Sequence, residues 1–445
     1  MSERGAEGRC ARASAVAGLL LAACWTASAL PERRVNTDES KVPPYAIEDV
    51  LVTTNGTRLT SAAQWPERRR ELLALIEREL YGKWPAAPET LVVDEGKELR
   101  TFYDLARIRQ FAMYFRSDCS GPRIDWMLLE PVHVQGSVPL IVMLNYRGNH
   151  EHLAESGIGV SDFWVDKLRQ RGATPNRIDA SVRGQMRYPY DLVLARGYAV
   201  LTACYHQAAP DPLPEEMPLD EVRSRGLYRL WADKDVGTLA VWGWTMCRGL
   251  DLAARLPELD MKRTVAYGYS RLAKAALIAG AFDERFAVVV PCQPGGGGVA
   301  LQKRQFGENA DWMTQVFPHW FCAAYQKYAN NEAAMPLDQH FLVAAVAPRR
   351  LLVQGFDEPW YDTKGEWLSC RAASPAWELL GRKGLSAGEF PEDFSTAATA
   401  GDIGYVRRPG THGISGYDWM WMLDFADASW RATPHSENKS KGAKQ

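Results

Sequence analysis

Short, uninterrupted apolar segments alternate with longer amphipathic ones along most of the chain. The short segments are rich in Val, Ile, Leu and aromatic residues, which is typical of strands that are buried on both faces of a sheet. The predicted strands cover residues 138–146, 198–205, 263–270, 286–292, 349–356 and 402–410.

Segments with helical periodicity separate these strands. Because buried strands joined by helices of ten or more residues form parallel sheets covered on both faces, the sequence predicts an α/β fold, a three-layer sandwich with a mostly parallel central sheet. No repeat or low-complexity break interrupts residues 45–433, so we expect one domain there. The predicted helices include residues 66–82, 235–256, 271–282 and 418–430.

The two ends of the chain have a different character. Residues 1–29 combine arginines with the apolar run AVAGLLLAA, which is typical of an export signal and too short to span a bilayer. LAAC resembles a lipobox that would lipidate Cys24, and ASA, directly before residue 30, resembles an ordinary cleavage site. Either interpretation predicts an exported protein: periplasmic, an outer-membrane lipoprotein, or secreted. We expect residues 30–44 to be a linker and residues 434–445 a disordered tail.

Composition excludes several classes of function. The formal net charge is −2, so no basic field indicates nucleic acid, and we expect membrane contact only through a lipid anchor at Cys24. Neither C-x-x-C nor H-E-x-x-H occurs, so no zinc site is expected. The 16 tryptophans suit a core and also platforms for sugar rings. We expect a monomer.

Ser270 ends a predicted strand and precedes a predicted helix, in the segment VAYGYSRLAK. A sharp turn at this junction would lift the hydroxyl out of the sheet and point the next backbone N–H at a developing oxyanion, as in a nucleophile elbow. The usual motif is G-x-S-x-G, and here the last glycine is absent. A serine before a helix is also an ordinary N-cap, so this segment alone leaves both interpretations open.

The order of residues along the chain supports catalysis, because such a hydrolase needs an acid and then a histidine after the serine. His412 lies in the glycine-rich segment PGTHGISGYDW, and loops of this kind carry function. His319 and His340 have apolar neighbours and are expected to be structural. The acid should follow the fifth predicted strand, where Asp357 and Glu358 are both candidates to orient the imidazole, with Glu358 preferred.

Two cations follow the serine. Arg271 is the next residue, and Lys274 lies four residues past Ser270 on the same predicted helix, where positions i and i+4 share a face. Cations in this place suit an anionic substrate or an oxyanion. As mere surface residues they would oppose the helix dipole, so a functional role is favoured.

The chain resembles the glucuronoyl esterases of carbohydrate esterase family 15, in their bacterial branch. The resemblance covers nearly all of residues 45–430, with many separate segments in register. It implies an α/β-hydrolase fold, a Ser–His–acid triad, and substrates that are esters of 4-O-methyl-glucuronic acid, the xylan side group, with lignin alcohols. The matching segments include ELYGKWP, LNYRGNH, ARGYAVLTACY, YSRLAKAALIAGAFDERFA, GGGG, FPHWFC, APRRLLV, WYDTKGEW and DWMWMLDFAD.

The resemblance also implies roles for individual residues. Ser270 matches the nucleophile, His412 matches the base, and Arg271 matches an arginine whose side chain aids the oxyanion hole. Three residues are candidates for contact with the sugar: Lys274, Trp360 and Gln315.

Three positions depart from the family's pattern. Many relatives have an acid after the strand that follows the nucleophile, where this chain has Gln293, a neutral amide that cannot stabilise an imidazolium as a carboxylate does. The acid role therefore falls on the acidic pair after the fifth predicted strand. Fungal members join two cysteines at the positions of Tyr269 and Gly413, and Ala273 replaces a common glycine.

The expected function is that of a serine esterase that hydrolyses glucuronoxylan or lignin–carbohydrate esters through an acyl-enzyme, without a cofactor or metal. A carbohydrate acetyl esterase with the same triad is one alternative. A non-catalytic glycan-binding relative is another, because of Gln293.

Overall fold

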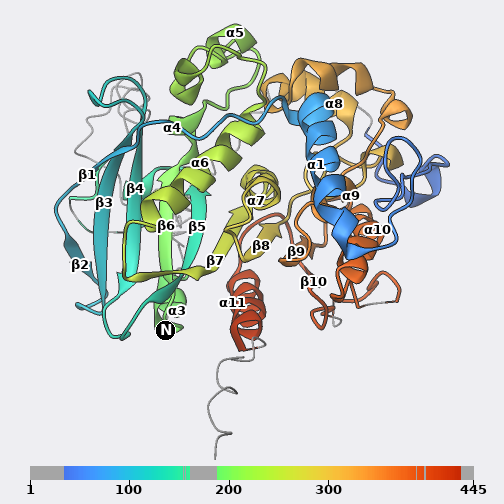
Figure 1. Ribbon diagram of the computed structural model, residues 1–445. Helices are drawn as coiled ribbons and strands as arrows, with labels where there is room; N and C mark the ends of the chain where they lie inside the picture. Colours follow the sequence, from blue (N-terminus) through green and yellow to red (C-terminus); the bar gives the residue numbers. More distant parts are fainter. Residues whose placement is uncertain are drawn as a thin grey trace, which may run out of the picture. The chain divides into compact units, whose positions relative to one another are not determined.

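One β-sheet forms the centre of the described part of the chain. The computed structural model describes residues 35–153, 155, 157–160, 188–386, 388–394 and 397–431. Within them ten strands pair in the order β1-β3-β4-β6-β5-β7-β8-β9-β10, and β2 pairs with β3 (Figure 1). The strands are β1 Val92–Glu95, β2 Leu99–Thr101, β3 Ala106–Tyr114, β4 Arg123–Pro131, β5 Val138–Asn145, β6 Ala199–Cys204, β7 Leu259–Tyr269, β8 Val288–Cys292, β9 Arg350–Phe356 and β10 Ile403–Arg408.

The sheet has a parallel part and an antiparallel part. The strands from β6 through β5, β7, β8 and β9 to β10 are all parallel. β1, β2, β3 and β4 pair in antiparallel fashion, and β4 joins β6 antiparallel as well. The predicted α/β fold with a mostly parallel sheet is confirmed, and each of the six predicted strands is present.

The antiparallel strands were not predicted from the sequence. In β3, buried Ile108 and Phe111 are interspersed with the half-buried Arg107, Arg109 and Gln110. Such interruption of apolar positions by polar ones is typical of an antiparallel sheet that faces solvent on one side. It breaks the continuous apolar run by which the parallel strands were found.

The four predicted helices are present, and others lie between them. The long helix α10 was not predicted, because its segment contains Gly365 and Pro375, which are poor helix formers. Residues 66–82 form α1 and then a short π-helix, η3 Glu77–Tyr81. The α-helices are α1 Trp65–Ile76, α3 Tyr190–Ala195, α4 Tyr205–Ala208, α5 Leu219–Val222, α6 Thr238–Ala253, α7 Arg271–Phe282, α8 Ala310–Val316, α9 His340–Ala344, α10 Thr363–Leu379 and α11 Gly416–Arg431.

Helices cover both faces of the sheet. On β5, Leu140 and Val142 belong to a hydrophobic core shared with α6 and α7. The alternate residues Ile141 and Met143 belong to a second core, shared with α3 and α11. Figure 1 shows α6 and α7 on one side of the sheet and α3 and α11 on the other. The predicted three layers are therefore present.

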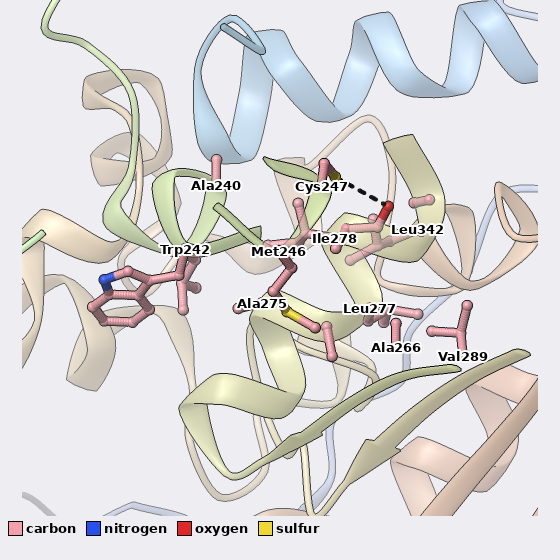
Figure 2. Packing of buried hydrophobic residues seen from close by; sticks show 14 of the residues in the cluster. Ala240, Trp242, Met246, Cys247, Ala266, Ala275, Leu277, Ile278, Val289 and Leu342 are labelled. Atoms are coloured by element: carbon pink, nitrogen blue, oxygen red, sulfur yellow. Dashed lines mark hydrogen bonds between the residues drawn. The ribbon is translucent and has the colours of Figure 1, made fainter. Parts of the chain in front are cut away.

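Small residues let α6 and α7 pack closely on one face. A Cβ added to Gly243 of α6 would lie 3.0 Å from the carbonyl oxygen of Ala275 on α7. Around this crossing, Met246 of α6 and Ile278 of α7 are buried over Ala266 of β7 (Figure 2). This packing holds the start of α7, and so the turn that precedes it, against the end of β7.

Part of the segment that was expected to be a linker lies on the folded unit. The carbonyl oxygen of Asn36 accepts a hydrogen bond from Gly307 N at 2.8 Å. Glu39 forms ion pairs with Arg304 at 2.7 Å and with Lys364 at 3.2 Å. Within the described ranges no helix has the length and apolar character needed to cross a membrane. The predicted export signal and the predicted tail (434–445) lie outside the described residues.

Candidate active site

Ser270 occupies a sharp turn between β7 and α7. Its backbone has φ 58° and ψ −128°, a conformation that costs a residue with a side chain about 1–3 kcal/mol and that clusters at functional sites. Gly268 makes the turn sterically feasible, because a Cβ there would lie 2.0 Å from the carbonyl oxygen of Leu272. The turn has the backbone strain and the strand-to-helix position of a nucleophile elbow.

The elbow brings Ser270 to His412. Ser270 N donates to the carbonyl oxygen of Cys292, at the end of β8, over 2.9 Å. The Ser270 hydroxyl lies 3.0 Å from His412 Nε2, on the loop between β10 and α11. Two residues separated by 142 positions thus form a hydrogen-bonded serine–histidine pair at the carboxyl edge of the parallel strands, where ligand sites of such sheets lie.

Aromatic rings enclose the imidazole of His412. Tyr361 stacks on it at 4.4 Å between ring centroids, and Tyr269 stacks on it at 4.7 Å. The ring of Phe356 lies at 5.3 Å and is tilted. From the sequence alone, Tyr269 is only a departure from the cysteine of fungal relatives. In the structure its ring orients the imidazole that Ser270 contacts.

The surroundings of His412 favour its neutral form. Burial lowers the pKa of His412 to about 3, and the positive charges of Lys274, Arg271 and Arg408 act in the same direction. An imidazole with such a pKa is neutral near pH 7. A neutral Nε2 has a lone pair that can accept the proton of the serine hydroxyl, as a general base must.

The two candidate acids have different partners. Glu358 Oε2 accepts a hydrogen bond from the backbone N–H of His412 at 3.1 Å. Asp357 is about half exposed and pairs with Arg407 at 3.1 Å. His412 Nδ1 is buried and has no hydrogen-bond partner among the described residues. The structure therefore brings Glu358, and not Asp357, into contact with the histidine residue, through its backbone rather than its ring.

Gln293 holds the loop that carries the histidine. Its Nε2 donates to the carbonyl oxygen of Gly413 at 2.8 Å, and its Oε1 accepts from Gly413 N at 3.1 Å. One amide side chain thus satisfies both backbone groups of the residue after His412, which a carboxylate cannot do because it has no donor. Arg408 also donates to the carbonyl oxygen of Gly413. From the sequence alone, Gln293 is only a missing acid, and this role was not predicted.

The guanidinium of Arg271 is anchored by a buried carboxylate. It pairs with Asp211 and lies over the rings of Phe317 and Trp320, with its central carbon 5.0 and 5.1 Å from their centroids. His319 contacts the same carboxylate at 2.8 Å. Nothing local in the sequence indicated Asp211, which lies in a proline-rich stretch far from Arg271 along the chain.

Asp211 is a fully paired anion. Its side chain is 0% exposed and also accepts hydrogen bonds from Tyr205 and Trp320, each at 2.9 Å. Although burial opposes ionisation, the charge of Arg271 and the contact with His319 keep the pKa of Asp211 well below its usual range. Asp211 therefore fixes the position of the Arg271 side chain beside Ser270.

Lys274 is buried, and its ammonium group bonds to protein acceptors. Its Nζ donates to the carbonyl oxygens of Pro294 and Gly296 at 2.8 and 2.6 Å. It also pairs with Glu308 at 2.7 Å. An ammonium has three donors, so all of them are used within the described structure. This differs from the expectation of a cation that faces the pocket with donors available for a ligand.

The other two candidates for sugar contact lie on neighbouring elements. Trp360 is half-buried and packs edge-on against Trp312 of α8, with ring centroids 5.0 Å apart. It directly precedes Tyr361, which stacks on the imidazole of His412. Gln315 is an exposed residue of the same α8, and its amide donates to Asp311 at 2.5 Å. No described contact connects Gln315 with Ser270 or His412.

Comparisons of the sequence with known proteins agree on one family. Residues 197–381 match the family described as glucuronyl esterase, fungi. A carbohydrate esterase of an unknown prokaryotic organism is 33% identical over 407 residues, which cover 89% of this chain and 92% of that protein. A 4-O-methyl-glucuronoyl methylesterase of Hypocrea jecorina (strain QM6a) is 23% identical, over 80% of this chain and 66% of the fungal protein.

Solved structures show the same architecture. A promiscuous CE15 esterase from a marine bacterial metagenome has a TM-score of 0.79 and 33% identity, covering 88% of this chain and 99% of the other. A glucuronoyl esterase from Solibacter usitatus has a TM-score of 0.79 and 32% identity, covering 88% and 100%. The α/β-hydrolase fold that the sequence resemblance implied is therefore confirmed.

Proposed function

Because this chain belongs to carbohydrate esterase family 15, we propose that it is a serine esterase that hydrolyses esters of 4-O-methyl-glucuronic acid. The observation that carries the proposal is the hydrogen bond of 3.0 Å between Ser270 Oγ and His412 Nε2 at a strained elbow. The substrates would be the ester links between the uronic acid side groups of glucuronoxylan and lignin alcohols.

The first half of the reaction transfers the acyl group to Ser270. His412 Nε2 accepts the hydroxyl proton while Ser270 Oγ attacks the carbonyl carbon of the uronoyl ester. The carbonyl oxygen becomes an oxyanion, which the backbone N–H of Arg271 would meet, as the residue after the nucleophile does in this fold. The bond from carbon to the alcohol oxygen then breaks, and the alcohol leaves with the proton from His412.

The second half releases the acid. Water gives a proton to His412 and attacks the acyl-enzyme, and the ester bond to Ser270 breaks. Ser270 Oγ takes the proton back, so the enzyme is restored and one water has been consumed for each ester. The side chain of Arg271, held by Asp211, would add positive charge beside the oxyanion.

We assign the acid role to Glu358. It is the carboxylate that contacts the His412 residue, so its charge lies near the imidazolium that forms when Ser270 loses its proton. For the sugar, Trp360 is the candidate wall, next to the Tyr361 ring. Lys274 would contact the sugar as part of its ion pair with Glu308. Gln315, which is exposed, is the third candidate for sugar contact.

The test is turnover of benzyl glucuronate. Ser270→Ala should lower kcat by roughly 10³-fold or more, because the nucleophile is lost while the pocket is kept. Ser137→Ala is a matched control at an exposed serine of another loop and should keep full activity. Full turnover by Ser270→Ala would contradict the assignment.

A broader ester range is the second candidate, because one solved relative is described as promiscuous. An acetylated xylo-oligosaccharide assayed beside benzyl glucuronate separates the two. Release of acetate at a comparable kcat/KM would favour a carbohydrate acetyl esterase. Binding of sugar without turnover of either ester would favour a glycan-binding relative.

We propose export as the localisation, from the arginines and apolar run of residues 1–29. Mass spectrometry of the mature N-terminus after expression in a Gram-negative host would distinguish lipidated Cys24 from cleavage just before residue 30. A Cys24→Ser variant should lose membrane association if the lipid anchor is present.

A further inference from the structure

Tyr146 and Ser270 are the first residues after two neighbouring parallel strands. β5 ends at Asn145, and β7 ends at Tyr269. Where these strands pair, Val142 lies beside Ala266, and the same register continued to the strand ends puts Tyr146 beside Ser270. The segment LNYRGNH therefore leaves the sheet next to the nucleophile elbow.

The hydroxyl group of Tyr146 contacts the backbone of this elbow. It donates a hydrogen bond of 2.5 Å to the carbonyl oxygen of Tyr269, the residue before Ser270. The ring of Tyr146 is half-buried and packs edge-on against the rings of Tyr205 and Tyr269, with centroids 5.4 and 6.1 Å away. Both the ring and the hydroxyl thus hold the phenol beside the nucleophile.

Other groups of the elbow act on the same phenol. Burial raises the pKa of Tyr146. The positive charge of Arg271 and hydrogen bonding with the Ser270 hydroxyl and the Leu272 N–H act in the opposite direction. Because burial is the larger effect, the phenol keeps its proton at neutral pH. It lies next to the nucleophile and to the first turn of α7, where an oxyanion would form.

The fold leaves a place for a second oxyanion donor at this position. In an α/β-hydrolase the oxyanion accepts one hydrogen bond from the N–H after the nucleophile and another from the loop that follows the neighbouring strand. Here the neighbouring strand is β5, and Tyr146 is the first residue of the loop after it. Tyrosine hydroxyls are among the side-chain donors that stabilise oxyanions in enzymes.

We propose that the Tyr146 hydroxyl is the second oxyanion donor, beside the N–H of Arg271. The inference rests on the proposed function, because the oxyanion forms when Ser270 attacks an ester. In the resting site the phenol donates to the neutral carbonyl oxygen of Tyr269. A hydrogen bond to a charged acceptor is roughly twice as strong as one to a neutral acceptor. The hydroxyl therefore turns to the oxyanion as negative charge develops, and it keeps its proton throughout.

Tyr146→Phe removes the hydroxyl and keeps the ring. We expect kcat and kcat/KM for benzyl glucuronate to fall together, by roughly tenfold to hundredfold, because the lost hydrogen bond is made in the transition state and not in the substrate complex. Binding of the substrate should not change. Calorimetry with benzyl glucuronate in the Ser270→Ala background should give the same Kd with and without Tyr146→Phe. A Kd weakened as much as kcat/KM falls would overturn the proposal.

Tyr228→Phe is a matched control for the loss of a tyrosine hydroxyl. The Tyr228 hydroxyl also donates to a backbone carbonyl oxygen, that of Val236, over 2.5 Å, and it belongs to no part of the candidate active site. Urea denaturation shows how much stability each substitution removes, and only Tyr146→Phe should lower kcat. Full kcat in Tyr146→Phe, or an equal loss of kcat in both variants, would contradict the role of the phenol as an oxyanion donor.

A probe that is not an ester separates this proposal from the assignment of the substrate. Trifluoroacetophenone adds to a nucleophilic serine and forms a hemiketal oxyanion, which fluorine NMR detects. We expect Ser270→Ala to abolish the adduct and Tyr146→Phe to weaken it by about the same factor as it lowers kcat/KM. An adduct of unchanged affinity in Tyr146→Phe refutes the oxyanion role alone. An adduct that depends on Tyr146, in a chain that hydrolyses no glucuronate ester, refutes the substrate assignment alone.

Discussion

The two sides of the serine–histidine pair are built in different ways. Ser270 is placed by backbone geometry: a positive φ, a glycine two residues earlier, and a helix that begins at once. His412 is placed mainly by the side chains of Gln293 and Glu358, which come from distant parts of the chain, with help from Arg408 on the preceding strand. The nucleophile therefore depends on local sequence, and the base depends on contacts over long distances in the chain.

This difference predicts that the two sides tolerate replacement of a glycine differently. Gly268 lies where a Cβ would meet backbone at 2.0 Å, and Gly413, beside His412, has nothing within 4 Å. The elbow is a close-packed junction with no room for an added methyl group. The histidine loop has room for one at Gly413 and is held in place by hydrogen bonds.

The largest effect is expected for Gly268→Ala. The added methyl group must displace the backbone of Leu272, so the free energy of unfolding should fall by about 3 kcal/mol or more, and activity on benzyl glucuronate should be lost. Gly413→Ala is the matched control and should change stability by less than about 1 kcal/mol. Urea denaturation measures both. Equal destabilisation by the two substitutions would contradict the comparison.

The acid comes next. Glu358→Gln should lower kcat/KM by roughly tenfold or more, because the charge near the imidazolium is removed. Asp357→Asn should change it by less than about twofold, because an exposed ion pair such as that with Arg407 is worth only about 0–1 kcal/mol. Steady-state kinetics on benzyl glucuronate give both values. A larger loss for Asp357→Asn would move the acid role to Asp357.

A smaller effect is expected for Gln293→Leu. The substitution keeps the volume but removes the hydrogen-bond acceptor of Gly413 N and leaves the Gly413 carbonyl with Arg408 alone, at a cost of about 1–3 kcal/mol in the free energy of unfolding. Because the loop then holds His412 less firmly, kcat should fall by roughly tenfold while KM changes little. Gln326→Leu, at an exposed glutamine, is the control. Unchanged kcat in Gln293→Leu would show that the amide does not position the base.

The smallest effect is expected from pH. Because the pKa of His412 is lowered to about 3, the imidazole stays neutral as the pH falls from 8 to 5, and kcat/KM should vary by less than about twofold in that interval. The same shift means that the unfolded chain, with a histidine pKa near 6.5, binds protons that the folded chain does not, so His412 lowers stability as the pH falls below about 6.5. A pH profile of kcat/KM with an acid limb near pH 6.5 would contradict a buried neutral base.

Sequence patterns predicted the parts of the molecule that local rules determine. The parallel strands are continuous apolar runs, the elbow has its glycine and serine in order, and His412 stands in a glycine-rich loop after a predicted strand. The family resemblance then supplied the function. Strands such as β3 were not predicted, because polar residues on their exposed face interrupt the apolar run.

The remaining parts of the site depend on which distant residues meet. Asp211 and Arg271 are 60 positions apart in the chain and form a pair in the folded chain. The amide of Gln293 contacts Gly413 across 120 positions. The same is true of Lys274, whose spacing from Ser270 predicted a shared face but not the acceptors that occupy its ammonium group. Such partners follow from tertiary structure and leave no mark in the local pattern.

The stacking of Tyr269 on His412 has a practical consequence. Fungal members of the family have a disulfide beside the histidine, whereas this chain has a ring contact and amide hydrogen bonds there. All the described cysteines are free thiols. The catalytic domain should therefore fold and work equally well with or without dithiothreitol, so a reducing bacterial cytosol is an adequate place to produce it.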